Sequence, residues 1–345
     1  MEEKKTNLSL IVPGSGETVF YDVSLPPFKV HGLKLDGEGY YRLPHDVAAA
    51  TSPSVEQLNL QTAGGRVRFR TDANRIVLKA EMREISKFSH FSLTGTAGFD
   101  LYAGGIYRGT FVPPWDVETG FTGELTLEGD GMREILIHFP LYAGVTRLEL
   151  GFPPGSRLAP APDYDVTLPT VYYGSSITQG GCASRPGNAY ENMLSLWLSC
   201  EHVNLGFSGS AKGETAMAAY IAGLPMSAFV LDYDYNAPTP EHLEATHAPF
   251  FQTVRDKNPE LPIFLLSRPQ PVPTAEDLQR REIIRKTWET AVKNGDKNVT
   301  FVDGTEMLRL FGDDCGTVDN CHPNDLGFYC MAKTLAPLLK RALKK

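Results

Sequence analysis

Two segments in the C-terminal half of the chain carry residues that could perform nucleophilic chemistry. The first reads GSSITQGG over residues 174–181 and places Ser175 and Ser176 directly after an apolar run. A serine hydroxyl at such a turn can attack a carbonyl carbon once a base removes its proton. The same pattern is also typical of an ordinary turn with a helix N-cap.

The second segment could supply that base. It reads DNCHPND over residues 319–325, so Asp319 and His322 are three positions apart. One local turn can bring the carboxylate to the Nδ1–H of the imidazole, which fixes the tautomer and leaves Nε2 free to accept a proton. The alternative is a solvated histidine that happens to precede a proline.

Two further segments offer hydrogen-bond donors for a negatively charged oxygen. NLGFSGS, at residues 204–210, contains Gly209, whose backbone N–H could be exposed in a tight turn. DYDYNAP, at residues 232–238, contains Asn236, whose side-chain amide can donate to an oxyanion. Each has a plain turn as its alternative. Together the four segments supply nucleophile, base, orienting carboxylate and oxyanion donors, which favours acyl transfer through a serine.

A parallel sheet would bring the four segments together. After Pro169 apolar runs alternate with amphipathic stretches about five times, which predicts a parallel sheet covered by helices. Ligands bind beyond the carboxyl ends of such strands, where these segments fall. The expected strands are 171–173, 202–206, 228–233, 262–267 and 299–302, and the expected helices are 189–200, 214–222, 240–257, 275–293 and 326–343.

The N-terminal half has a different sequence pattern. Short alternating runs, broken by Gly, Pro, Asp and Asn, predict an all-β sandwich or jelly roll over residues 1–152. Residues 153–168 contain four prolines and little periodicity, so we expect a surface linker there. The hydrolytic candidates then lie in a second domain at 169–345. The clearest sandwich strands are 66–71, 75–82, 133–139 and 146–152.

Composition excludes several classes of protein. With 33 Lys and Arg against 41 Asp and Glu, the net charge of −8 argues against a partner such as nucleic acid or an anionic membrane. The sequence shows neither an apolar run of 18 residues nor a signal-peptide pattern, and we expect a cytoplasmic protein. Five cysteines fit reduced thiols. Cys315, Cys321 and His322 could suggest zinc, but the usual C-x-x-C pairing is missing, so we expect no metal.

The four segments resemble the four sequence blocks of the SGNH hydrolases, also called the GDSL lipase/acylhydrolase superfamily. The resemblance implies a flavodoxin-like, three-layer α/β/α domain with Ser176 as nucleophile, His322 as base and Asp319 as its orienting group. It implies an oxyanion hole made by the backbone N–H groups of Ser176 and Gly209 and by the Asn236 side chain. It also implies that catalysis needs no cofactor.

Two details refine this resemblance. The usual Asp before the nucleophile is Ser175 here, as in a branch that carries G-[ST]-S-I-T, and block position favours the second serine. In the N-terminal half, GFDLY at 98–102 and FPLY at 139–142 are similar to the GxDLY β-sandwich domain that precedes esterase domains of this branch. The resemblance thus spans nearly the whole chain.

The expected activity is hydrolysis of short-chain esters, acetyl foremost, on a carbohydrate or similar polyhydroxy compound, through an acyl-serine. Arg185 could bind a polar alcohol part or be an exposed structural arginine, and Trp115 could stack on a sugar or be buried between domains. The alternatives are an acyltransferase, a lysophospholipase or thioesterase, and a non-catalytic glycan-binding protein. The expected partner is a small-molecule or oligosaccharide ester, and a homo-oligomer is compatible with the sequence.

Overall fold

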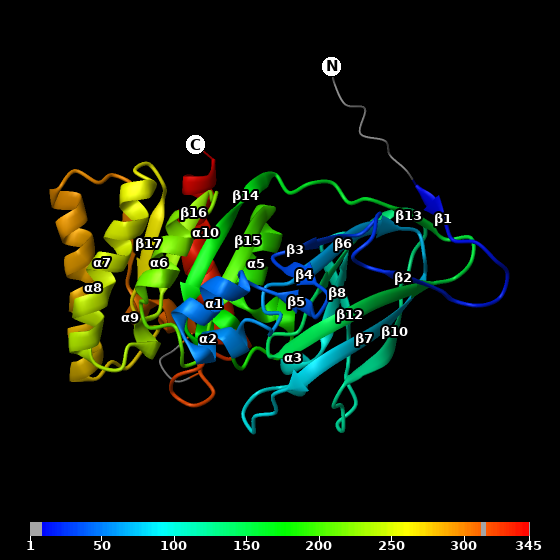
Figure 1. Cartoon of the computed structure of the whole chain (residues 1–345), viewed down its shortest axis with the longest axis horizontal. Coiled ribbons are helices and arrows are strands. Elements are labelled where there is room, and N and C mark those ends of the chain that lie inside the picture. The colour runs from blue at the N-terminus through cyan, green and yellow to red at the C-terminus, as the bar shows by residue number, and fades with distance from the viewer. Residues whose placement is uncertain (1–8, 312–314, 345) are drawn as a thin grey trace, which may run out of the picture.

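The structure, a computed structural model, describes residues 9–311 and 315–344. An all-β half lies beside an α/β half along the long axis of the molecule (Figure 1). None of the helices in the described part of the chain is both long and apolar enough to cross a membrane.

Two antiparallel sheets form the N-terminal sandwich, as expected. Along β6 and β11, alternate residues such as Phe69 and Ile137 are fully buried in the core between the sheets, and this period of two is the cause of the alternating sequence pattern. One sheet has the order β1-β13-β6-β11-β8-β9, with β3 also paired to β6, and comprises β1 (Leu10–Ile11), β3 (Lys29–His31), β6 (Arg66–Thr71), β8 (Phe99–Ala103), β9 (Ile106–Phe111), β11 (Arg133–His138) and β13 (Arg157–Ala159). The other has the order β10-β7-β12-β2 and comprises β2 (Val19–Asp22), β7 (Arg75–Ile85), β10 (Gly120–Thr126) and β12 (Ala143–Phe152).

Short elements border the sandwich. They are the hairpin strands β4 (Lys34–Asp36) and β5 (Gly39–Tyr41) and the helices α1 (His45–Thr51), α2 (Pro53–Leu58) and α3 (Leu93–Thr96). Leu43, Ala48 and Val55, in and just before α1 and α2, are completely buried in the apolar core of the α/β half. This stretch of the N-terminal half is therefore part of the C-terminal core.

The C-terminal half is a three-layer α/β/α structure with a five-stranded parallel sheet. Its strand order, β15-β14-β16-β17-β18, is the flavodoxin-like order, which confirms the expected fold. The strands are β14 (Val166–Gly174), β15 (Cys200–Gly206), β16 (Ala228–Asp232), β17 (Ile263–Leu266) and β18 (Val299–Val302). The helices are α4 (Ser176–Gln179), α5 (Tyr190–Leu198), α6 (Thr215–Ala222), α7 (Pro240–Lys257), α8 (Ala275–Lys293), α9 (Gly304–Met307) and α10 (Asp325–Leu343), with 3₁₀ turns η1 (Pro186–Asn188), η2 (Asp234–Asn236) and η3 (Leu308–Phe311).

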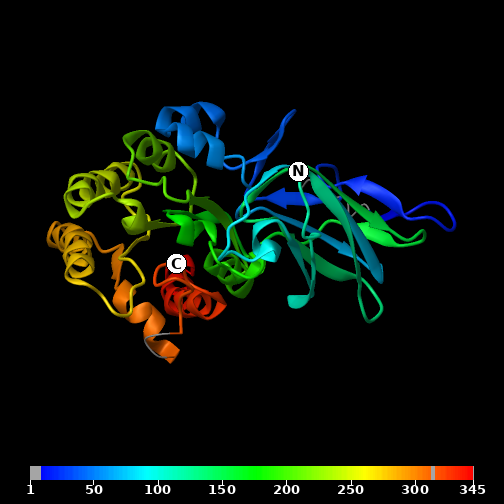
Figure 2. The ribbon, with the colours of Figure 1, turned by 90° about the horizontal axis from the view of Figure 1, so that it is seen from below.

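The two faces of this sheet are covered by different helices. Successive residues of β16 point to opposite faces, so Phe229 packs in the core with α6, α7 and α8, whereas Val230 packs in the core with α5 and α10. Seen from below, these helices surround the strands on both sides (Figure 2). Burial on both faces explains why β16 reads as a continuous apolar run.

The stretch expected to be an irregular linker contains regular structure. Within residues 153–168, β13 pairs with β6 and β14 begins at Val166. β13 is three residues long and takes its place through pairing with a strand almost ninety positions away, which local patterning does not reveal. The chain therefore passes directly from the last sandwich strand into the parallel sheet.

Candidate active site

The turn after β14 separates the two adjacent serines. Ser175 is 1% exposed and caps α4, because its hydroxyl accepts a hydrogen bond from the backbone N–H of Ile177 at 3.1 Å. Gly174 makes the sharp turn possible, since a Cβ there would lie 2.0 Å from Oγ1 of Thr178. The hydroxyl of Ser176, the first residue of α4, is left to face the loop before α10.

Ser176, His322 and Asp319 form a hydrogen-bonded chain. Oγ of Ser176 lies 2.8 Å from Nε2 of His322, and Nδ1 of His322 lies 2.8 Å from Oδ2 of Asp319. Burial disfavours a charged Asp319, but hydrogen bonds from the side chain and backbone N–H of His322 outweigh it and hold the pKa of Asp319 below its usual range. The carboxylate is therefore charged at neutral pH and can stabilise an imidazolium at His322.

The expected oxyanion donors lie on the loops after β15 and β16. Gly209 has a left-handed φ of +67°, which favours glycine, and a Cβ there would meet no atom within 4 Å, so its backbone is open to approach. Nδ2 of Asn236 donates to the carbonyl of Phe207 at 2.9 Å, which ties the two loops together and leaves its second hydrogen for a ligand. No group in the described part of the chain accepts a hydrogen bond from the backbone N–H of Ser176 or Gly209.

Two side chains to which sequence reasoning assigned no role connect the Ser176 turn with the Gly209 loop through buried hydrogen bonds. Oε1 of Gln179, at the end of α4, accepts a hydrogen bond from the backbone N–H of Ser208 at 3.0 Å. Nδ2 of Asn204 donates to the carbonyl of Thr178 at 2.6 Å. Both side chains are at most 1% exposed, so these bonds hold the Ser176 turn and the Gly209 turn in one frame.

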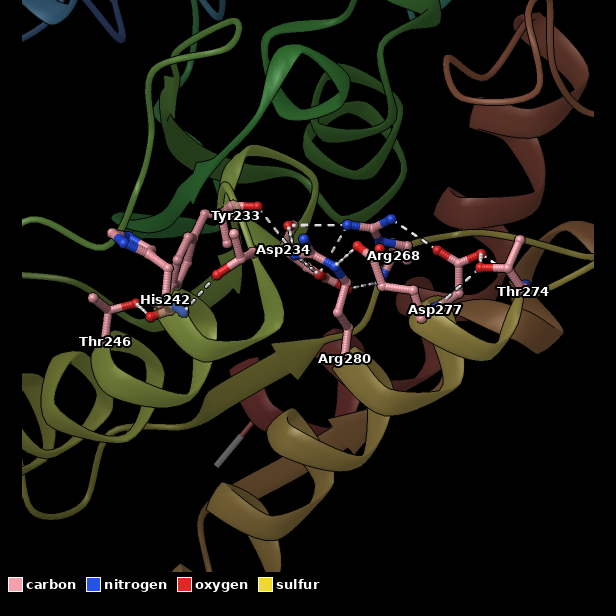
Figure 3. A network of polar contacts seen from close by, with 11 residues as sticks. Tyr233, Asp234, His242, Thr246, Arg268, Thr274, Asp277 and Arg280 are labelled. Atoms are coloured by element: carbon pink, nitrogen blue, oxygen red, sulfur yellow. Dashed lines mark hydrogen bonds and ion pairs between the residues drawn. The ribbon is translucent and has the colours of Figure 1, made fainter.

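A network of charged residues holds the turn that carries Asn236 (Figure 3). Asp234, in η2, accepts a hydrogen bond from the backbone N–H of Arg268 at 3.0 Å. Nη1 of Arg280, from α8, donates to the carbonyl of Ala237 at 3.1 Å, and Nη1 of Arg268 donates to Asp277 at 2.8 Å. Nη2 of Arg268 also donates to the carbonyl of Asp234 at 3.3 Å, so two guanidinium groups hold the turn that carries Asn236.

A carboxyl group is buried directly behind the Ser176 turn. Asp232, at the end of β16, accepts hydrogen bonds from Oγ1 of Thr178 at 3.0 Å and from the hydroxyl of Tyr190 at 3.1 Å. Burial raises the pKa of Asp232 to about 7, although these two hydrogen bonds favour its charged form. The group therefore changes charge near neutral pH.

The β-sandwich contributes side chains to the same site. His90 and Phe91 follow β7, and Nε2 of His90 lies 3.8 Å from Oδ2 of Asp319. The ring of Phe91 meets that of His322 edge-on with centroids 5.6 Å apart. The sequence carries no local signal for these contacts, because the two segments lie more than 200 positions apart. The site is therefore built from both halves of the chain.

The family of the chain is decided by comparison with family models. The model of the GDSL-like lipase/acylhydrolase family matches residues 167–340, and the GxDLY model, which describes the N-terminus of SGNH-hydrolase-type esterases, matches residues 18–158. The chain belongs to the GDSL-like lipase/acylhydrolase family. A search of curated protein sequences found no significant match.

Solved structures share the fold of this GDSL-like protein over both halves. A GDSL-like lipase from Bacteroides ovatus is 28% identical, with a TM-score of 0.84 over 95% of this chain and 98% of that one. A salicylyl-acyltransferase from a tetracycline biosynthetic pathway is 21% identical, with a TM-score of 0.76 over 92% and 95% of the two chains. An active-site mutant of a family two carbohydrate esterase from Clostridium thermocellum is 16% identical, with a TM-score of 0.63 over 93% and 99%.

Arg185 of the GDSL-like protein lies between the two halves. Its Nη1 donates to Oδ2 of Asp100 at 2.5 Å and to the hydroxyl of Tyr102 at 2.7 Å, and its guanidinium stacks 4.0 Å from the ring centre of Tyr107. Asp100, from the GxDLY motif, is completely buried and also accepts from His138 at 2.8 Å. The guanidinium is thus engaged by the sandwich, and its side chain is only 20% exposed, so Arg185 is not the exposed arginine considered above.

Trp115 lies at the surface. Its side chain is 83% exposed, so the expectation of burial between domains is wrong. The carbonyl of Trp115 accepts a hydrogen bond from Nζ of Lys87 at 3.0 Å, which joins its loop to the segment that carries Phe91. The indole is therefore exposed to solvent, where its ring can stack on a ligand.

Proposed function

We propose that the protein is a serine esterase that hydrolyses short-chain esters, acetyl foremost, of a carbohydrate or similar polyhydroxy substrate. The observation that carries the proposal is the pair of 2.8 Å contacts that link Ser176 to His322 and His322 to Asp319. This geometry has the nucleophile within reach of its base and the base within reach of its orienting carboxylate, as acyl transfer requires.

The proposed reaction proceeds in two steps. Nε2 of His322 takes the proton of Ser176 as Oγ attacks the ester carbonyl, and the backbone N–H groups of Ser176 and Gly209 and the amide of Asn236 stabilise the oxyanion. His322 then protonates the departing alcohol. In the second step, His322 activates a water molecule that releases the acid from the acyl-serine. Asp319 stays charged throughout and stabilises the imidazolium.

The substrate class is inferred from an exposed tryptophan and from the likeness to carbohydrate esterases. Trp115, which is 83% exposed, offers an indole face on which a sugar ring can stack. Structures with the same fold include family two carbohydrate esterases and an acetyl xylan esterase. The expected partner is therefore a small-molecule or oligosaccharide ester. We also propose a cytoplasmic location, in line with the thiols of Cys182, Cys200, Cys321 and Cys330, and detection of the enzyme in culture medium would contradict it.

Acetate release from acetylated sugars and oligosaccharides tests the proposal. The wild-type protein should release acetate, and Ser176→Ala should not. A series of p-nitrophenyl esters from acetyl upward distinguishes an acetylesterase from a lysophospholipase or thioesterase, which would prefer long chains. A glycan-binding protein without catalytic activity would bind the sugars and release no acetate.

Acyl transfer is the second candidate, favoured by the likeness to the salicylyl-acyltransferase over more than nine-tenths of both chains. A transferase would use the same Ser176 and His322 but protect the acyl-serine from water. Product analysis with added acceptor alcohols separates the two activities, because a transferase forms the new ester in preference to free acid.

A further inference from the structure

A histidine of the sandwich, a cysteine of the nucleophile loop and the histidine of the candidate catalytic chain converge at the domain boundary. A ring nitrogen of His90, Sγ of Cys182 and a ring nitrogen of His322 all lie within 4.8 Å of one another. Two imidazoles and one thiol are ligands that Zn²⁺ prefers, and in a tetrahedral zinc site N and S ligand atoms are about 3.5 Å apart. The three side chains thus need to close by only about an ångström around an ion.

We propose that His90, Cys182 and His322 form a zinc site, and that zinc bound there blocks the active site reversibly. Binding would release the thiol proton of Cys182 to solvent and leave the fourth position of the ion to water. The ion would act as an inhibitor that competes with the proton of Ser176 for His322. The inhibition rests on the proposed esterase activity, whereas the binding does not.

His322 is already held in the orientation that a metal ligand needs. Its Nδ1 contacts Oδ2 of Asp319 at 2.8 Å, so Nε2 is the nitrogen open to an ion. Histidine ligands of zinc commonly donate their other N–H to a carboxylate, which fixes the ring and strengthens its basicity. The same Nε2 lies 2.8 Å from Oγ of Ser176, so zinc and catalysis would use one lone pair. Bound zinc would therefore exclude proton transfer from Ser176.

Cys182 is held by its backbone as well as by its surroundings. It is one of three non-glycine residues in the described part of the chain with a left-handed φ, here +70°, and its side chain is 8% exposed. A non-glycine residue is strained in this conformation, so the surrounding turn imposes the direction of its Cβ. The preceding residue is a glycine, and a Cβ there would lie 3.0 Å from side-chain atoms of both Phe91 and Tyr142, so the chain runs close to these two rings before it reaches Cys182.

Cys321 is the competing thiol, since it also groups with Asp319 and His322. A site made of these three would draw Asp319 into the ion's coordination sphere, although the carboxylate now accepts from Nδ1 of His322 and from the backbone N–H groups of Cys321 and His322. The site with His90 and Cys182 leaves these bonds unbroken. We therefore assign the thiolate to Cys182, and Cys321→Ser becomes the matched control.

Cobalt binding tests the site without reference to activity. Ser176→Ala keeps all three ligands, and titration of this full-length variant with Co²⁺ should give a thiolate-to-cobalt absorption band that saturates at one equivalent. In the Ser176→Ala background, Cys182→Ser should abolish the band, His90→Asn should weaken binding at least about tenfold, and Cys321→Ser should leave both unchanged. A band that survives Cys182→Ser, or that is lost with Cys321→Ser, would overturn the assignment.

Zinc inhibition tests the consequence. In the otherwise wild-type protein, micromolar Zn²⁺ should inhibit hydrolysis of p-nitrophenyl acetate, EDTA should restore it, and His90→Asn should raise the half-inhibiting concentration at least about tenfold. Inhibition that is equally strong in His90→Asn would show a different site. Melting curves verify that each variant is folded. If Cys182→Ser does not fold, Cys182→Ala takes its place in the experiment. A protein without esterase activity that still shows the cobalt band would refute the proposed function and leave the zinc site standing.

Discussion

The hydroxyl of Ser175 accepts a hydrogen bond from the backbone N–H of Ile177 at 3.1 Å. This bond caps α4 and is buried, whereas the neighbouring Ser176 has its Oγ 2.8 Å from Nε2 of His322. Two hydroxyls that are adjacent in the chain thus have different surroundings, one structural and one open to reaction. The difference can be measured.

Substitution of the two serines should separate stability from activity. Ser176→Ala should lower kcat on p-nitrophenyl acetate by about 10³-fold or more with little change in melting temperature, because it removes the nucleophile but no structural bond. Ser175→Ala should cost about 1 kcal/mol of unfolding free energy through loss of the cap and keep most of the activity. Full activity in Ser176→Ala together with an inactive Ser175→Ala would reverse the assignment.

Removal of the Asn236 amide should slow catalysis without weakening substrate binding. Asn236→Ala should lower kcat about 10²–10³-fold at nearly constant KM, because the amide would act on charge that develops only in the transition state. Asn294→Ala, at the exposed end of α8, is the matched control and should behave as wild type. Since Asn236 also binds the carbonyl of Phe207, a urea unfolding curve must accompany the kinetics. A rise in KM alone would place the amide in ground-state binding instead.

Arg185 should matter for stability rather than for substrate affinity. Arg185→Met leaves the completely buried Asp100 without its guanidinium partner, which typically costs about 3–5 kcal/mol for a buried pair. Urea unfolding should show this loss, and KM should change little in variant protein kept well below its unfolding midpoint. Arg341→Met, near the exposed end of α10, should cost nothing measurable. A large rise in KM with unchanged stability would instead return Arg185 to a substrate-binding role.

The buried Asp232 should make stability depend on pH. Its pKa is raised to about 7 in the folded protein, so between pH 4 and 7 the folded state holds a proton that the unfolded state has released. The free energy of unfolding should therefore fall as the pH rises through this range, by up to about 1.4 kcal/mol per pH unit, and level off above it. Urea unfolding of wild type and Asp232→Asn at pH 5, 6 and 7 measures the contribution of Asp232 as the difference between the two proteins in how the free energy of unfolding changes with pH. Equal slopes in the two proteins would show that Asp232 keeps one charge state across this range.

Most of the fold was predictable because the spacing of apolar residues within each segment indicates whether that segment is a strand or a helix. β6, β18, α7 and α8 have the residue bounds that were expected, since period-two alternation and helical spacing are written in the segments themselves. The start of β14, by contrast, comes earlier than predicted. Val166, Thr167 and Leu168 are partly or fully exposed and lack an apolar pattern, so only pairing with β15 shows that they extend the strand.

The site was predictable only where one half of the chain supplies it. Ser176, Gly209, Asn236 and the Asp319–His322 loop all lie at the carboxyl edge of one parallel sheet, where topology brings such loops together. His90 comes from the other half, and no spacing rule relates a loop of a sandwich to a loop of a parallel sheet. Gln179 had no local clue either, because its burial and its bond to Ser208 follow from the packing of two separate loops.

The burial of Leu43, Ala48 and Val55 in the core of the α/β half has a consequence for how this architecture evolves. A gene fragment that encodes only the parallel-sheet half would lack part of its own interior and expose the apolar face of α6. Recombination near residue 160 therefore cannot trade one sandwich for another as an independent cassette. A substitution at this buried contact in one half must be compatible with the residues of the other half. The two halves are therefore expected to evolve together.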